Sequence, residues 1–209
     1  MTKLIIFDLD GVLIDSKEIH FNALNLALNE FGNDLVITRK EQDNIFEGLT
    51  TKAKLDILTK IKGLSPDLHA SIWKLKQEYS AKLFTSVSPD EELISLFKFI
   101  KSNGIKIAVA SNSIRETLDT CLKSLGLIDL IDYSLSNEDV DLPKPSPEIY
   151  NRVMKHFDAS PDSVAIFEDS PVGLAAAYAS GALFVEPVRN RKDIWFDRIL
   201  RVVEDLNET

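Results

Sequence analysis

Short, mostly apolar runs alternate with amphipathic segments over much of this 209-residue chain. Apolar runs of this kind are typical of strands buried on both faces of a parallel sheet. The predicted strands are 4–7, 105–110, 131–135, 163–167 and 182–186. Segments with helical spacing separate the later strands, at about 93–101, 114–125, 147–157 and 172–180. Strands separated by helices of this length indicate right-handed crossovers and a mostly parallel sheet.

The stretch that follows the first strand has a different pattern. Between residues 16 and 85 the apolar positions recur at helical spacing, and no segment in this stretch is typical of a strand. We therefore expect an α/β fold, with a doubly wound (Rossmann-like) parallel sheet core and an α-helical domain inserted after the first strand. The expected core comprises 1–15 and 86–209, and the expected insertion is 16–85.

Composition and charge narrow the range of partners. The formal net charge of -9 leaves no basic excess to neutralise phosphates, so we expect no nucleic-acid partner and no attraction to anionic membranes. No apolar run has the ~20 residues that a spanning helix needs, and the N-terminus has no pattern typical of a signal peptide. We expect a cytoplasmic protein that is a monomer or a weak homo-oligomer. The basic residues of the tail, such as Arg189 and Arg198, are expected to be ordinary surface charge.

Polar side chains follow two of the buried strands directly. Asp8 and Asp10 come after the first strand, and Ser111 and Asn112 come after the strand at 105–110. Because an unpaired carboxylate is costly to bury, Asp8 and Asp10 should face water, a cation or a reactant. The hydroxyl of Ser111 can donate to a phosphoryl oxygen. The alternatives are an acidic turn at the first position and a simple helix cap at the second.

Two later segments add a cation and further carboxylates. Lys144 lies between two prolines, whose restricted backbone can aim its ammonium group at an anion. Glu168 and Asp169 end the strand at 163–167, and Asp8 and Asp169 together can hold a hard cation such as Mg²⁺. The alternatives are a solvated lysine and an acidic turn before a helix. Together, these segments supply the residue types that a phosphoryl-transfer site requires.

With these residues the chain resembles the haloacid dehalogenase superfamily of phosphotransferases, over residues 4 to 190. Asp8-Leu9-Asp10-Gly11-Val12 is similar to its first motif, Ser111-Asn112 to its second, Lys144 to its third and Glu168-Asp169 to its fourth. The resemblance implies that Asp8 is a nucleophile forming an aspartyl-phosphate and that Asp10 is the general acid and base. It also implies that Ser111 and Lys144 neutralise the phosphoryl group, with Asn112 beside the substrate.

The resemblance further implies a Mg²⁺ cofactor. Its ligands would be the carboxylates of Asp8 and Asp169 and the backbone carbonyl of Asp10. Glu168 would either hydrogen-bond to a ligand or, less often, bind the cation directly. Asp10 also favours phosphoryl transfer over carbon–halogen cleavage, because dehalogenases resemble this motif without the second aspartate.

The inserted domain resembles the helical cap of the subgroup that contains β-phosphoglucomutase and many small phosphatases. The resemblance places His20, Gly48 and Thr51 near the substrate, although His20 fits a helix surface equally well. The chain departs from the mutase pattern, since Glu47 and Thr51 stand where that pattern has a lysine and an arginine. Lys52 or Lys54 could replace these cations. We expect a Mg²⁺-dependent phosphatase acting on a small phosphorylated metabolite such as a sugar phosphate, with a phosphomutase as the alternative and a non-catalytic binding protein less favoured.

Overall fold

The computed structural model describes residues 2–46, 49–189 and 195–208, and the side chains of 195 and 196 are outside that description. The chain folds into two compact units. The core unit contains residues 1–16 and 87–209, and the insert contains residues 17–86. No helix in the described ranges combines the length and apolar content that crossing a bilayer requires.

The core unit is built on a parallel sheet, as the sequence predicts. Its strands, in the spatial order β3-β2-β1-β4-β5, are β3 (Tyr133–Leu135), β2 (Lys106–Ala110), β1 (Leu4–Phe7), β4 (Val164–Glu168) and β5 (Phe184–Pro187). Strand β1 is central and fully buried, which explains its wholly apolar sequence. Because β2, β1 and β4 are parallel neighbours, the residues that follow them meet at one edge of the sheet.

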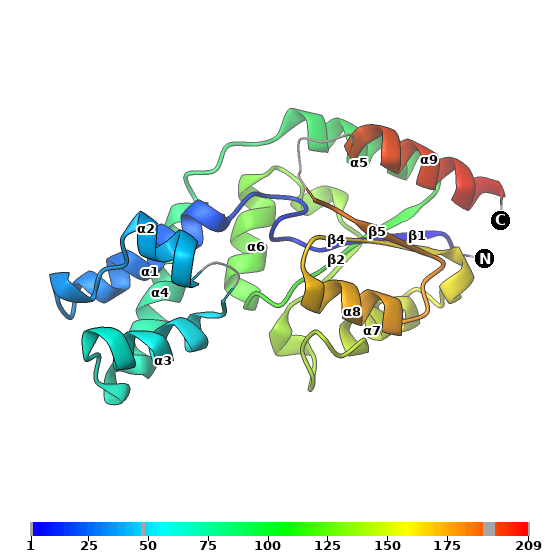
Figure 1. Ribbon diagram of the computed structural model, residues 1–209. Coiled ribbons are helices and arrows are strands. Elements are labelled where there is room, and N and C mark those ends of the chain that lie inside the picture. The colour runs from blue at the N-terminus through cyan, green and yellow to red at the C-terminus, as the bar shows by residue number, and fades with distance from the viewer. Residues whose placement is uncertain (1, 47–48, 190–194, 209) are drawn as a thin grey trace. The chain divides into compact units, whose positions relative to one another are not determined.

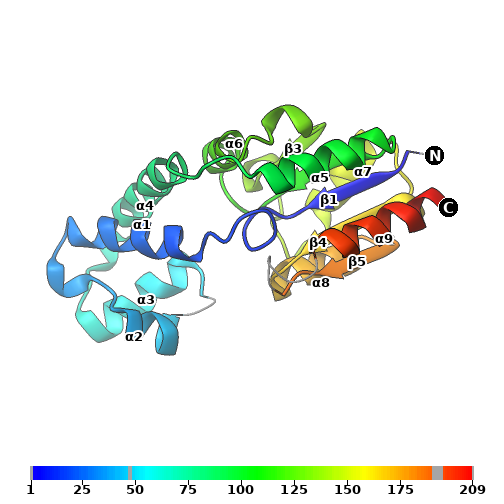
Figure 2. The same cartoon turned by 90° about the horizontal axis from the view of Figure 1, so that it is seen from above.

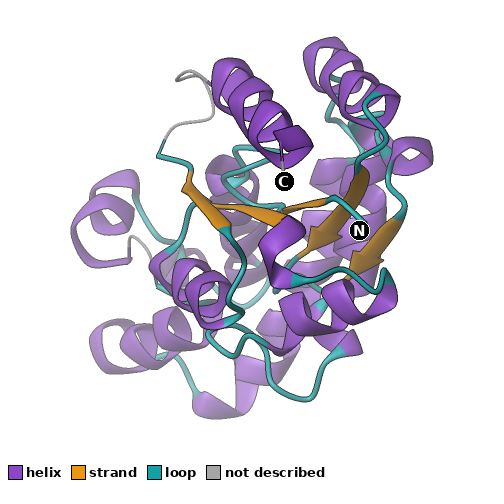
Figure 3. Cartoon of the chain, turned by 90° about the vertical axis from the view of Figure 1, so that its right-hand side faces the viewer, coloured by secondary structure: helices purple, strands orange, loops and turns teal. Residues whose placement is uncertain are grey.

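Helices cover both faces of this sheet (Figure 3). Figures 1 and 2 show α5 and α9 over one face, and Figure 1 shows α7 and α8 on the other. The helices of the core unit are α5 (Glu91–Ser102), α6 (Arg115–Ser124), α7 (Glu148–His156), α8 (Pro171–Ala179) and α9 (Trp195–Glu208). Each of α5, α6 and α7 buries apolar side chains at i, i+3, i+4 and neighbouring positions, the stripe that docks an amphipathic helix on a sheet. The predicted α/β fold with a helical insertion after the first strand is confirmed.

The tail ends in helix α9, which buries Ile199, Val202, Val203 and Leu206 on one face. Arg189 is exposed, and Arg198 donates to the carbonyl of Pro187 at 2.8 Å and forms a partly exposed ion pair with Glu186 at 2.9 Å. Sequence reasoning missed the helix because the i, i+3, i+4, i+7 spacing of these four apolar residues is hidden among charged neighbours.

The insert is wholly helical within its described residues. Its helices are α1 (Lys17–Asn29), α2 (Arg39–Glu41), α3 (Thr51–Lys62) and α4 (His69–Phe84), with short helical turns between them. Helices α1 and α4 lie side by side in Figures 1 and 2. The insert has its own apolar cluster, which includes Leu24, Leu28, Phe46, Leu58 and Ile72. We propose that the core unit and the insert are the two domains that the sequence indicates.

Asp132 ties β2 to the start of β3 and gives a pH-dependent contribution to stability. Its carboxylate accepts from the N–H of Ile107 at 2.9 Å and from Lys101 Nζ at 3.0 Å. Burial alone would raise the pKa of Asp132, but these donors hold it below its ordinary value of 3.8. A carboxyl whose pKa is lowered on folding stabilises the protein above its ordinary pKa, and that stabilisation is lost as the pH falls through the lowered value.

We expect Asp132→Asn to lower the free energy of unfolding by about 1 kcal/mol at about pH 7, because an amide keeps one acceptor but loses the charge. The difference should shrink as the pH falls below about 4, and it should disappear below the lowered pKa of Asp132, where the wild-type carboxyl is protonated as well. Urea titrations of wild type and variant, at about pH 7 and at a pH below the lowered pKa of Asp132, measure this difference in the free energy of unfolding. An equal difference at both pH values would show that the ionised form of Asp132 has no special role.

Candidate active site

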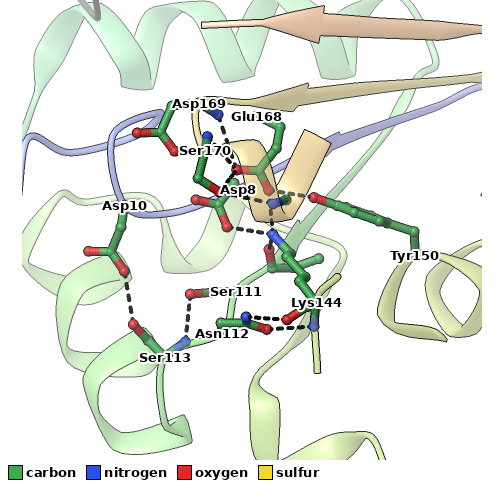
Figure 4. A network of polar contacts seen from close by, with 12 residues as sticks. Asp8, Asp10, Ser111, Asn112, Ser113, Lys144, Tyr150, Glu168, Asp169 and Ser170 are labelled. Atoms are coloured by element: carbon green, nitrogen blue, oxygen red, sulfur yellow. Dashed lines mark hydrogen bonds and ion pairs between the residues drawn. The ribbon is translucent and has the colours of Figure 1, made fainter. Parts of the chain in front are cut away.

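Four of the loops that follow strands bring the predicted site residues together at one edge of the sheet. Figure 4 shows Asp8, Ser111, Lys144, Glu168 and Asp169 in one network of polar contacts. Asp8 follows β1, Ser111 follows β2, and Glu168 and Asp169 end β4. Lys144 reaches them from the loop that precedes α7. Residues that are up to 161 positions apart in the sequence (Asp8 to Asp169) therefore form one site.

Asp8 is a buried carboxylate held by a single cation. It is 6% exposed, its N–H donates to the carbonyl of Phe167 at 2.9 Å, and its Oδ1 lies 2.7 Å from Lys144 Nζ. Burial raises the pKa of Asp8 well above its ordinary value, and the charges of Glu168 and Asp10 add to the rise, whereas Lys144 opposes it. The site therefore favours added positive charge near Asp8.

Lys144 is buried, so the alternative of a solvated surface lysine is wrong. Its Nζ donates to Asp8 Oδ1 at 2.7 Å, to Glu168 Oε2 at 2.7 Å and to the carbonyl of Ala110 at 2.9 Å. These three bonds use all the protons of the ammonium group. Burial alone would lower the pKa of Lys144, but the charges of Asp8 and Glu168 raise it above its ordinary value. Lys144 is therefore a fixed positive charge.

Asn112 holds the backbone of Lys144 in place. Its side-chain Nδ2 donates to the Lys144 carbonyl at 3.2 Å, and its Oδ1 accepts from the Lys144 N–H at 3.1 Å. The amide therefore fixes the loop that carries the ammonium group. The expected contact of Asn112 with substrate stays a prediction.

Glu168 accepts hydrogen bonds on both of its oxygens. Oε1 accepts from the N–H of Asp169 and from the N–H and hydroxyl of Ser170, at 3.1, 3.2 and 3.1 Å. Oε2 accepts from Lys144 and from the hydroxyl of Tyr150 at 2.8 Å. Burial would raise the pKa of Glu168, but Lys144 and the other donors hold it below its ordinary value. Glu168 is thus an ionised carboxylate that shapes the turn carrying Asp169.

The acidic group fits a divalent cation. Asp8, Glu168 and Asp169 each offer a carboxylate oxygen, and these three oxygens all lie within 4.8 Å of one another. Burial and the charges of Glu168 and Asp10 raise the pKa of Asp169 to about 6, as expected of clustered carboxylates, although Lys144 opposes the rise. Gly11, at a φ of +82°, leaves room for Asp169, because a Cβ there would lie 1.9 Å from its Oδ2. Hard oxygen ligands of this kind suit Mg²⁺.

Asp10 is held separately, by two hydroxyl groups. Ser16 donates to its Oδ1, and Ser113 donates to its Oδ2 at 2.9 Å. The hydroxyl of Ser111 accepts from the N–H of Ser113 at 3.0 Å, and within the described residues its own proton has no acceptor. Ser111 can therefore still donate to an added oxygen. The alternative, in which the polar residues after β2 only cap the next helix, is wrong. The N-cap residue of α6 is Ile114, and it makes no side-chain cap hydrogen bond.

Two of the residues predicted from the insert, His20 and Thr51, lie in described helices of that unit. His20 lies in α1 with its Nδ1 3.2 Å from Lys76 Nζ and its ring edge-on to Phe84, at a centroid distance of 5.8 Å. Thr51 is the first residue of α3, which Thr50 caps by accepting from the N–H of Ala53. Gly48 and Glu47 lie outside the described residues. The expected roles of His20, Gly48 and Thr51 stay predictions.

Sequence reasoning misses three residues of the network. The sequence pattern places Ser16 in the insertion, and it assigns no part in the site to Ser113 or Tyr150. The available signal is position, since Ser113 follows Ser111 in the same loop and Tyr150 lies six residues after Lys144. No pattern in the sequence shows that Asp10 lies beside Ser16 and Ser113.

A buried carboxylate beside a fixed cation, a second carboxylate and an acidic group that fits a divalent cation are the components that phosphoryl transfer requires. The chain belongs to the family of haloacid dehalogenase-like hydrolases, whose model matches residues 5–186, and it is a phosphatase of that family. The resemblance that the sequence motifs indicate is therefore confirmed.

The similarity to known proteins and solved structures extends over nearly the whole chain. The phosphorylated carbohydrates phosphatase of Thermotoga maritima is 28% identical over 206 residues, covering 98% of this chain and 87% of its own. The β-phosphoglucomutase of Bacillus subtilis is 24% identical and covers 98% and 91%. A variant of CbbY from Rhodobacter sphaeroides, solved with xylulose-(1,5)bisphosphate, is 26% identical, covers 90% and 87%, and superposes with a TM-score of 0.72. All three names concern phosphorylated sugars.

Proposed function

We propose that this phosphatase hydrolyses a small phosphorylated sugar through an aspartyl-phosphate formed on Asp8. The observation that carries the proposal is the difference between the surroundings of two carboxylates. Lys144 pairs with Asp8, whereas the hydroxyls of Ser16 and Ser113 donate to Asp10. A nucleophile must stay ionised and a general acid must hold a proton, so different surroundings suit the two roles. The relatives that act on phosphorylated carbohydrates support the substrate class.

In the first step an oxygen of Asp8 attacks phosphorus, and the bond from phosphorus to the sugar oxygen breaks. Asp10 donates its proton to that leaving oxygen, with its side chain oriented by Ser16 and Ser113. Lys144 and the hydroxyl of Ser111 neutralise charge on the transferring group, where such stabilisation has its largest effect. In the second step Asp10 accepts a proton from the water that attacks the aspartyl-phosphate, and inorganic phosphate leaves.

The acidic group supports an assignment of the metal ligands. Asp8 and Asp169 would hold Mg²⁺, with Glu168 next to them. The resemblance to the family suggests the carbonyl of Asp10 as a third ligand. When bound, the cation supplies positive charge that favours ionised Asp8 and neutralises phosphoryl oxygens. We further propose that the insert, with His20, Gly48 and Thr51, is the cap that selects the substrate.

We expect the protein to release inorganic phosphate from one or a few sugar phosphates in the presence of Mg²⁺, and to lose this activity with EDTA. The measurement is phosphate release from a panel of hexose and pentose mono- and bisphosphates, with nucleotides and phosphoglycolate as other classes. Addition of Mg²⁺ after EDTA should restore the rate, which separates metal loss from damage.

Each outcome of the panel decides a different part of the proposal. Release from nucleotides alone would contradict the sugar substrate and keep the phosphatase. If no compound is hydrolysed but β-glucose 1-phosphate is isomerised with a bisphosphate primer, the protein is a mutase. Release that EDTA does not affect would contradict the cation site.

A further inference from the structure

Tyr150 contacts both ends of the buried ion pair between Lys144 and Glu168. It lies in the first turn of α7 and is 0% exposed. Its hydroxyl donates to Glu168 Oε2 at 2.8 Å, and the centre of its ring lies 4.9 Å from Lys144 Nζ. Figure 4 shows the tyrosine on the side of Glu168 that is away from Asp10. Tyr150 thus contacts Glu168 and Lys144 from the side that faces away from Asp10 (Figure 4).

Two carboxylates compete for the ammonium group of Lys144. Asp8 Oδ1 and Glu168 Oε2 each lie 2.7 Å from Nζ, so the position of the cation depends on how strongly each oxygen attracts it. Oε2 also accepts a hydrogen bond from the Tyr150 hydroxyl, which stabilises part of the negative charge on that oxygen. Within the described part of the chain, Asp8 Oδ1 accepts from Lys144 and from no second donor. The hydroxyl of Tyr150 therefore weakens the attraction of Lys144 to Glu168 and leaves its attraction to Asp8 unchanged.

We propose that Tyr150 is a positioning residue that keeps Lys144 on Asp8 by sharing Glu168 Oε2 with it. The inference rests on the proposed function, in which Lys144 and Asp8 act on the phosphoryl group. Without the hydroxyl, Glu168 is a carboxylate that is 1% exposed and has lost one of its donors. Oε2 then accepts from Lys144 alone, while Oε1 keeps its three donors. Because a buried carboxylate oxygen that has lost a donor attracts the remaining cation more strongly, Lys144 moves towards Glu168 and away from Asp8.

The variant Tyr150→Phe removes the hydroxyl and keeps the ring. With p-nitrophenyl phosphate and Mg²⁺ we expect kcat to fall about tenfold, as for the loss of one hydrogen bond to a charged group. We expect KM to change by less than about twofold, since the tyrosine does not contact substrate. Tyr79→Phe is the matched control, because Tyr79 also donates to a carboxylate at 2.8 Å, that of Glu30 in the insert. It should keep the wild-type kcat.

The position of Lys144 is measured directly in the metal-free protein. A buried ammonium group with three acceptors exchanges its protons slowly, so its ¹⁵Nζ signal is observable by NMR in lysine-labelled protein and is assigned by its loss in Lys144→Met. We expect Tyr150→Phe to shift or broaden this signal, and Tyr79→Phe to leave it unchanged. This readout needs no substrate, so a failure of the proposed function leaves it intact.

A double-mutant cycle tests whether the effect passes through Glu168. In the Glu168→Gln background, Tyr150→Phe should lower kcat by clearly less than it does in the wild type, because the charged acceptor is already absent. The proposal is overturned if Tyr150→Phe leaves kcat unchanged at a temperature where it is folded, or if the Lys144 signal does not move. Additive effects in the cycle overturn it too. A wild type without activity, combined with a shifted Lys144 signal, contradicts the proposed function and keeps the positioning role.

Discussion

Asp8→Asn is expected to lower the rate of phosphate release by at least about 10⁴-fold, since the variant has no oxyanion to attack phosphorus. Asparagine has the same shape, and its side-chain oxygen can still accept from Lys144. The fold should therefore persist. The measurement is phosphate release with the best compound of the panel, at saturating Mg²⁺, for wild type and variant.

Stability should move in the opposite direction. Burial holds the pKa of Asp8 above its ordinary value, and a group of this kind destabilises the folded state when it is ionised, at a pH above that value. In metal-free buffer at about pH 7, the neutral amide should give a melting temperature equal to or above that of the wild type.

Asp162→Asn is a matched control, because Asp162 is exposed and lies in the short helical turn before β4, whereas the site residues follow the ends of the strands. It should have wild-type activity. Near-normal activity of Asp8→Asn would exclude Asp8 as the nucleophile.

Lys144→Met should reduce both activity and stability. We expect kcat to fall by about 10²- to 10³-fold, because the variant removes a fixed positive charge from the transferring phosphoryl group. The free energy of unfolding should fall by about 3–5 kcal/mol, since the change leaves Asp8 and Glu168 buried without their cation. Urea titration measures the second effect and steady-state kinetics the first.

The two effects of Lys144→Met must be separated by measuring kcat where the variant is folded. If the activity per folded molecule equals that of the wild type, Lys144 has only a structural role. Lys123→Met is the matched control, because it removes the same charge from an exposed position of α6. It should change neither kcat nor stability by a measurable amount, as is usual for exposed charges.

The stability of the site and its activity therefore depend on charge in different ways. Asp8, Glu168 and Asp169 offer three carboxylate oxygens within 4.8 Å of one another, and Lys144 is the cation that joins two of these residues. Such a cluster is costly to fold, and its arrangement is useful only when further positive charge and a phosphoryl group are present. We expect Ser170, whose N–H and hydroxyl reduce this cost by donating to Glu168, to support activity without contacting the substrate.

Much of the fold could be predicted because the signals are local. Leu4–Phe7 is apolar throughout since both faces of a central parallel strand are covered, and such a run is typical of that position. The stripe of Leu93, Leu96, Phe97 and Ile100 marks α5 in the same way. Helix α9 escapes sequence reasoning because its four buried apolar positions are separated by charged residues, and the charge dominates the pattern of the tail.

The candidate site was predictable in its members but not in its contacts. The order Asp8, Ser111, Lys144, Asp169 along the chain is visible, and the parallel sheet brings the ends of its strands to one edge. The contacts of each side chain depend on packing between distant segments. Asn112 illustrates this, because its amide binds the backbone of Lys144, 32 positions away.

The strands, the helical insertion and the types of residue at the strand ends can be predicted, because hydrophobic periodicity and motif order are properties of short segments. The partners of these residues depend on how the chain packs in three dimensions. The tertiary structure places Ser16 and Ser113 on Asp10, and it makes Tyr150 and Lys144 share one oxygen of Glu168. The physical reason is that hydrogen bonds act over about 3 Å, so their partners are fixed by how distant segments pack.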